Sequence, residues 1–226
     1  MLINMDVRTR SQKRRLLIVD DHPLVRAGLV SLVNAEPDLE ICGDTGRVTE
    51  ALRLAQETRP DMVIVDISLA DGNGLTLIKR LKSKIPQIKS LVCSMHDESI
   101  FAQRALNAGA FGYINKQEAT EHVIDAIHRV LQGKIYLSAS MTEQVLLGAT
   151  KGEPRKTGSS INNLTDRELE VFELIGHCKG TSEIADQLHV SVKTVETHKE
   201  KLKRKLNLRS GAELTRRAIY WVLREK

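Results

Sequence analysis

Residues 61–74, DMVIVDISLADGNG, join four consecutive apolar residues to an acidic segment that contains glycine and asparagine. The apolar run at 62–65 predicts a buried β-strand, and the small polar residues after it predict a loop. In α/β sheets, ligands bind at the carboxyl ends of the strands, so Asp66 would lie at the mouth of a site. The same order of apolar strand, polar loop and amphipathic helix recurs throughout the first half of the chain.

Five strand–helix units of this kind follow one another. We expect strands at residues 15–19, 39–42, 62–65, 89–93 and 111–114. The helices begin at Pro23, 48, 75, 97 and 120, and Gly109 and Gly133 mark the ends of the last two. Strict alternation implies a parallel sheet covered on both faces. The sequence therefore predicts an α/β domain, a doubly wound (βα)5 fold with strand order 2-1-3-4-5.

The C-terminal part carries only helical periodicity, with polar residues at the helix starts. Thr165 and Glu168 form a capping box, Ser191 can cap a helix over 192–206, and a last helix begins at Ser210. A short helix over 182–188, a tight turn and the longer helix predict a helix-turn-helix. We therefore divide the chain into a disordered basic tail (1–14), the α/β domain (15–134), a linker (135–160) and an all-α four-helix domain (161–226).

Composition limits the classes of function. The net charge is +5, and residues 161–226 hold thirteen Lys/Arg against ten Asp/Glu, an excess of +3 that is compatible with nucleic acid. Few aromatic residues argue against a stacking platform for single strands or RNA. No apolar stretch is long enough for a signal peptide or membrane span, and the three cysteines lack metal-ligand spacing. We expect a cytoplasmic protein without membrane contact.

Polar residues follow four of the five predicted strands. Strands one and three are neighbours in the expected order, so Asp20, Asp21 and Asp66 would converge. Three carboxylates that close repel one another unless a cation lies among them, and oxygen ligands favour Mg²⁺. Such a carboxylate can take a phosphoryl group, with a hydroxyl from Ser94 and a positive charge from Lys116. Each residue alone is ordinary in a loop, but their joint placement favours a phosphoryl site.

With these residues the chain resembles a two-component response regulator of the NarL/FixJ class, which has a CheY-like receiver and a LuxR-type output domain. The resemblance begins near residue 15 and implies that Asp66 is the phosphoacceptor and a sensor histidine kinase the donor. It assigns Mg²⁺ binding to Asp20, Asp21, Asp66 and the backbone carbonyl of Ser68, contact with the phosphoryl group to Ser94 and Lys116, and the aromatic switch to Tyr113.

Two positions depart from the family pattern. The family usually has proline four residues after the phosphoacceptor and again after the lysine, where this chain has Ala70 and Gln117. We expect the loop after Asp66 to differ from the family. A cis bond before a non-proline residue costs about 2.5–4 kcal/mol, which disfavours the family's cis bond before residue 117.

The helix over 192–206 is the expected DNA reader, although a charged, solvated surface helix would have the same pattern. Here the resemblance to the LuxR-type domain rests on three motifs: Leu164-Thr165-x-Arg167-Glu168, Glu183-Ile184-Ala185 and Lys193-Thr194-Val195-x-Thr197-His198. By their chemistry, contacts with phosphates suit Lys193, Thr194, Lys199 and Lys201, and contacts with bases suit Glu196, Thr197 and Glu200.

The predicted function is a phosphorylation-dependent, sequence-specific DNA-binding transcription regulator rather than an enzyme. The family implies dimerisation through the last helix on inverted half-sites when active, and RNA polymerase is a further expected partner. One alternative is a regulator that does not depend on phosphorylation. Another is an aspartate-nucleophile phosphatase of the haloacid dehalogenase type, which carries an Asp-x-Asp pair where this chain has Ser68 two residues after Asp66.

Overall fold

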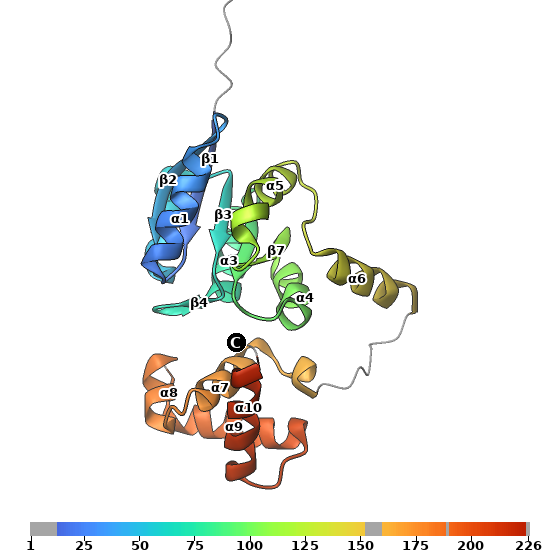
Figure 1. Cartoon of the computed structure of the whole chain (residues 1–226). Coiled ribbons are helices and arrows are strands. Elements are labelled where there is room, and N and C mark those ends of the chain that lie inside the picture. The colour runs from blue at the N-terminus through green and yellow to red at the C-terminus, as the bar shows by residue number, and fades with distance from the viewer. Residues whose placement is uncertain (1–12, 152–159, 189, 225–226) are drawn as a thin grey trace, which may run out of the picture. The chain divides into compact units, whose positions relative to one another are not determined.

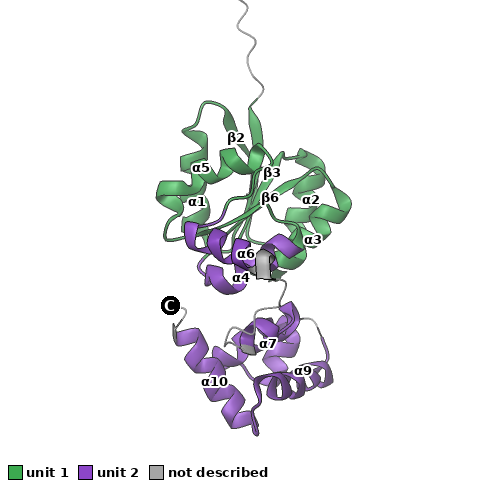
Figure 2. Ribbon diagram, turned by 90° about the vertical axis from the view of Figure 1, so that its right-hand side faces the viewer, with its two compact units in different colours: residues 1–94, 108–136 green, residues 95–107, 137–226 purple. Residues whose placement is uncertain are grey.

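The computed structural model describes residues 13–151, 160–188 and 190–224 (Figure 1). The chain divides into two compact units, one formed by residues up to 94 together with 108–136, the other by 95–107 together with 137–226 (Figure 2). Most of the predicted tail, residues 1–12, and part of the predicted linker, residues 152–159, lie outside the described residues.

The first unit contains a five-stranded parallel sheet. Its strands are β1 (Arg14–Val19), β2 (Leu39–Thr45), β3 (Met62–Val65), β6 (Lys89–Ser94) and β7 (Gly112–Asn115). Their order is β2-β1-β3-β6-β7, which confirms the predicted order 2-1-3-4-5. Every residue of β3 is at most 1% exposed, as is typical of a central parallel strand that is covered on both faces.

Helices cover both faces of this sheet. Helices α1 (Pro23–Asn34) and α5 (Ala119–Leu131) contact each other over one face, and α2 (Val48–Thr58) and α3 (Gly74–Lys84) contact each other over the opposite face (Figure 2). Helix α4 (Glu98–Ala108) is grouped with the second unit. The glycines expected after α4 and α5, Gly109 and Gly133, have φ angles of 104° and 80°, a left-handed conformation that glycine adopts readily.

The second unit holds the predicted helix-turn-helix. Helix α7 (Asp166–Gly176) starts with the predicted capping box, in which the Glu168 carboxylate accepts from Thr165 N at 2.8 Å. Helices α8 (Thr181–Gln187), α9 (Val192–Leu206) and α10 (Gly211–Arg224) follow. Their apolar sides meet in a core that contains Phe172, Ile184, Val195, Leu202, Ala218 and Trp221. The fold class predicted from the sequence is confirmed for both parts of the chain.

Two local features depart from the sequence-based expectation. The loop after Asp66 forms an antiparallel hairpin, β4 (Ser68–Leu69) and β5 (Gly72–Asn73). The predicted linker includes a helix, α6 (Ala139–Lys151), and a 3₁₀ turn, η1, lies at Ser160–Asn163. Helix α6 forms because Ser138 caps it, accepting from Met141 N at 3.1 Å, and because Met141 is buried.

None of the helices in the described part of the chain is long and apolar enough to span a membrane.

Gly74, the first residue of α3, couples the hairpin to the acidic loop. A Cβ atom at this position would lie 2.0 Å from the backbone oxygen of Asp66, closer than any real contact. We expect Gly74→Ala to lower the free energy of unfolding by about 3 kcal/mol, because the clash is with backbone rather than a flexible side chain. Urea denaturation of the full chain measures this change.

Gly28→Ala is the matched control. Gly28 lies within α1, and a Cβ atom there would meet nothing within 4 Å. Alanine in a helix interior is favoured over glycine, so this variant should gain roughly 0.5–1 kcal/mol. Equal denaturation midpoints for the two variants would show that the close approach at Gly74 is not a constraint.

Candidate functional site

The carboxylates of Asp20 and Asp66 converge at the carboxyl edge of the sheet. Val19 and Val65 are register partners in β1 and β3, so the residues that follow them emerge side by side, and Asp66 N donates to Val19 O at 2.8 Å. Asp20 is 1% exposed and Asp66 4%. The ligand atoms of Asp20, Asp21, His22 and Asp66 all lie within 4.8 Å of one another. The structure thus brings together the three acids predicted from the sequence.

Lys116 and Ser94 complete this cluster from the next two strands. Lys116 Nζ lies 2.6 Å from Asp20 Oδ2 and 2.7 Å from Asp66 Oδ2. Ser94 Oγ donates to Asp66 Oδ1 at 2.6 Å, and Ile67 N donates to the same oxygen at 2.7 Å. Burial opposes the charge of Lys116, but the adjacent Asp66 and Asp20 carboxylates outweigh burial and raise its pKa. Lys116 therefore remains an ammonium.

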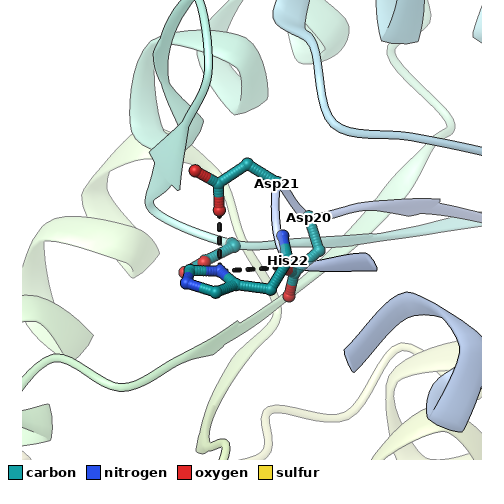
Figure 3. Close-up of side chains that lie close together, drawn as sticks. Asp20, Asp21 and His22 are labelled. Atoms are coloured by element: carbon teal, nitrogen blue, oxygen red, sulfur yellow. Dashed lines mark hydrogen bonds and ion pairs between the residues drawn. The ribbon is translucent and has the colours of Figure 1, made fainter. Parts of the chain in front are cut away.

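His22 is a member of the cluster that the sequence-based prediction left out. Figure 3 shows its ring between the two acids: Nδ1 lies 2.8 Å from Asp21 Oδ1 and 3.4 Å from Asp20 Oδ1. Its backbone N donates to Asp20 Oδ1 at 2.9 Å. Burial, together with the nearby Asp66 and Asp20 charges, raises the pKa of Asp21, and His22 opposes this effect. The signal in the sequence was its position directly between Asp21 and Pro23.

The chemistry of these side chains fits a hard divalent cation. Three carboxylates face one ammonium, so the site carries an excess of negative charge and offers oxygen donors, which Mg²⁺ prefers. Ser68, whose carbonyl the family resemblance adds to the ligands, opens β4 two residues after Asp66. Its role as a ligand stays a prediction.

Tyr113, the expected switch aromatic, is fully buried. It lies in β7 beside the strand that carries Ser94, with Val92 as its register partner, and Tyr113 N donates to Tyr136 O at 2.9 Å. In the structure the Tyr113 side chain is thus turned inward, into the core, while the Ser94 hydroxyl is hydrogen-bonded to Asp66.

The exposed side of α9 carries most of the predicted DNA contacts. Exposed positions include Lys193, Glu196, Thr197, Glu200 and Lys201, whereas Thr194 and Lys199 are half-buried. Ser191 caps the helix by accepting from Thr194 N at 3.1 Å. The Thr197 hydroxyl donates its proton to Lys193 O at 2.9 Å, so toward a base it can only accept, and its methyl group suits a thymine contact.

Comparison with known families identifies both parts of the chain. Residues 16–128 match the response regulator receiver domain, and residues 162–218 match the bacterial regulatory proteins of the luxR family. The chain belongs to the response regulators with a luxR-type output domain. It is 34% identical over 209 residues to the oxygen regulatory protein NreC of Staphylococcus carnosus, covering 91% of this chain and 96% of NreC.

A further relative and one solved structure are informative. The transcriptional activator protein ExaE of Pseudomonas putida is 36% identical over 206 residues, covering 90% of this chain and 95% of ExaE. The structure of RcsB from Salmonella enterica serovar Typhimurium bound to promoter rprA has a TM-score of 0.68 at 23% identity and covers 91% of this chain and 98% of RcsB. At that identity the likeness concerns the fold.

The loop where the family usually has proline is held by other contacts in this response regulator. Ala70 N donates to Gly46 O at 3.2 Å, a hydrogen bond that proline has no N–H to make. Next to it, the Asp71 carboxylate accepts from Val48 N at 2.5 Å, from Thr49 N at 3.2 Å and from Thr49 Oγ1 at 2.7 Å. Asp71 thereby caps α2 from across the loop. The described residues contain no cis peptide bond, so the bond before Gln117 is trans.

Asp71 should therefore contribute a pH-dependent part of stability. Burial opposes its ionisation, but the hydrogen bonds from Thr49 and Val48 outweigh burial and lower its pKa. We expect Asp71→Ala to cost roughly 0.5–2 kcal/mol at pH 7, as for the loss of a helix cap. Because the folded pKa lies below the unfolded value of about 3.9, this contribution is present above pH 4 and is lost as the pH falls through the folded pKa.

Urea denaturation at several pH values between 7 and 3.5 measures the gap in the free energy of unfolding between wild type and Asp71→Ala. The control is Asp125→Ala, which removes an exposed carboxylate 3.1 Å from Arg129 within α5 and should cost less than about 0.5 kcal/mol. If the Asp71→Ala gap did not narrow toward acid pH, the carboxylate would not be the group that caps α2.

Proposed function

We propose that this response regulator is a sequence-specific DNA-binding transcription regulator that is switched by phosphorylation of Asp66 by a sensor histidine kinase. The observation that carries the proposal is the set of contacts at Asp66. Both oxygens of this buried carboxylate face a donor that suits a phosphoryl group, the Ser94 hydroxyl at 2.6 Å and the Lys116 ammonium at 2.7 Å.

In the proposed reaction, a carboxylate oxygen of Asp66 bonds to phosphorus as the bond from phosphorus to the donor's imidazole nitrogen breaks. The product is an acyl phosphate, and the imidazole leaves with the electron pair of the broken bond. Lys116 and Ser94 would move from the carboxylate to the phosphoryl oxygens. Asp20, Asp21, Asp66 and the Ser68 carbonyl would hold Mg²⁺, which supplies positive charge that offsets repulsion between the carboxylates and the phosphoryl donor.

The output follows from the two residues next to this site. Ser94 ends β6 and Tyr113 lies on the neighbouring strand β7. A phosphoryl group that held the Ser94 hydroxyl by a hydrogen bond would therefore favour the inward position of Tyr113. We infer that this arrangement promotes dimerisation through α10 and binding to inverted half-sites, with RNA polymerase as a further partner. ExaE, named as an activator, and RcsB, solved on promoter DNA, support a DNA-binding output.

The two alternatives have less support. A haloacid dehalogenase-type phosphatase needs a second acid two residues after the nucleophile, and Ser68 occupies that position. A regulator that does not depend on phosphorylation would not need to bury two carboxylates at one edge of the sheet, where Lys116 has to offset their charge.

Beryllofluoride with Mg²⁺ tests the switch because it mimics a phosphoryl group on an aspartate. For the full chain, we expect DNA affinity to rise roughly 5-fold to 150-fold on its addition, the usual range of coupling between two sites. Asp66→Asn should lose this gain and keep the basal affinity, whereas Asp125→Asn should retain the gain. Fluorescence anisotropy with a labelled promoter duplex measures both affinities. Equal affinity with and without beryllofluoride in the wild type would contradict the switch.

A further inference from the structure

Three polar side chains form a closed hydrogen-bonded ring between α8 and α9. Thr181 Oγ1 donates to Glu196 Oε1 at 3.0 Å, and Lys199 Nζ donates to Thr181 Oγ1 at 2.8 Å and to Glu196 Oε1 at 3.2 Å. We call this the Thr181 ring. It joins two residues of the recognition helix to a residue outside it, at the first position of α8.

The Thr181 ring uses the only proton of the threonine hydroxyl and one of the two glutamate oxygens. The hydroxyl donates its one proton in a hydrogen bond to Glu196, and its oxygen accepts a hydrogen bond from Lys199. Within the described residues, both hydrogen bonds to the Glu196 carboxylate end on Oε1, which leaves Oε2 open to another donor. The hydrogen bonds from Lys199 and Thr181 also lower the pKa of Glu196, so the carboxylate stays ionised.

The Thr181 ring is poorly suited to a purely stabilising role. The Glu196 side chain is 51% exposed and that of Lys199 27%, and ion pairs as exposed as this contribute little to folding. The packing of α8 on α9 has its own apolar anchors, because Ile184 and Val195 are fully buried. Helix α8 is also held to α7, because Arg167 of α7 donates to Leu188 O at the end of α8 at 2.7 Å. The domain therefore does not need the Thr181 hydroxyl to fold.

What the Thr181 ring does provide is orientation. An exposed glutamate samples several rotamers, and ordering such a side chain on binding reduces affinity for the correct site. A carboxylate held in advance by two donors avoids that loss. Its orientation then favours a base whose donor lies where Oε2 points, and in the major groove the partner of a carboxylate is the N4 amino group of cytosine.

We propose that Thr181 is a positioning residue for base recognition, which fixes Glu196 so that its second oxygen accepts from a cytosine amino group. The inference rests on the proposed function, in which Glu196 contacts a base. It also revises the prediction for Lys199, which belongs to the Thr181 ring rather than to the set of free phosphate contacts.

Specificity, measured as a ratio of affinities, tests the inference. The full chain with beryllofluoride and Mg²⁺ is used to select its preferred duplex from a randomised pool. The dissociation constant is then measured for that duplex and for duplexes in which each C·G pair is replaced, at one fixed salt concentration. The variants are Thr181→Val, which keeps the shape without the hydroxyl, Thr181→Ser, which keeps the hydroxyl, and Glu196→Gln.

We expect Thr181→Val to reduce the preference for cytosine at one position roughly threefold to tenfold, the effect of freeing one or two side chains. Thr181→Ser should retain the preference. Ser182→Ala, which removes the neighbouring exposed hydroxyl, is the matched control and should leave the ratio unchanged. Circular dichroism and urea midpoints should be the same for all four variants and the wild type.

Two results would overturn the inference. If Glu196→Gln abolished the preference but Thr181→Val did not, Glu196 would read a base without needing Thr181. If Thr181→Val weakened all duplexes equally, Thr181 would have only a structural role. A Glu196→Gln variant with unchanged preference would instead contradict the base contact in the proposed function, and the inference would fail with it.

Discussion

The Lys116 ammonium between the Asp20 and Asp66 carboxylates is the interaction on which the receiver site depends. Its distances of 2.6 and 2.7 Å to these acids allow two buried negative charges to face each other. A buried charge without a partner costs several kcal/mol, so removing Lys116 would leave the two buried carboxylates uncompensated. The register of β1 with β3 imposes this proximity, because Val19 and Val65 are partners and the acids follow them directly. The same geometry gathers three carboxylates against one ammonium, and this excess of negative charge suits a divalent cation.

A second constraint connects the loop after Asp66 to helices α2 and α3. Gly74 has no room for a side chain against the Asp66 carbonyl, and its N donates to Ile67 O at 2.8 Å, so the loop closes tightly on itself. Asp71 then ties the loop to the start of α2. Ala70 in place of the usual proline is therefore not a defect, since the backbone hydrogen bond to Gly46 and the Asp71 cap hold the loop instead. The position of Asp66 is thus set by backbone contacts on both sides.

Much of this structure follows from patterns in the sequence, and the exceptions have physical reasons. Apolar periodicity and caps predict the observed bounds of β3 and α9 and the start of α2, because β3 and α9 are flanked by clear polar signals. The hairpin of β4 and β5 was missed since two-residue strands have no periodicity, and α6 because one buried residue, Met141, and one cap, Ser138, carry it. The predicted strand ends place the acids, Ser94 and Lys116 together, and the only sequence signal for His22 is its position beside Asp21. The Thr181 ring depends on side-chain geometry between two helices, which no linear pattern encodes.

We propose that Asp66 accepts the phosphoryl group. The most direct measurement is to incubate the full chain with acetyl phosphate and Mg²⁺, reduce the acyl phosphate with borohydride, and locate the modified residue by peptide mass spectrometry. We expect modification at Asp66, its absence in Asp66→Asn, and its loss when EDTA removes the cation. Modification at another residue with Asp66 untouched, or equal modification of wild type and Asp66→Asn, would contradict it.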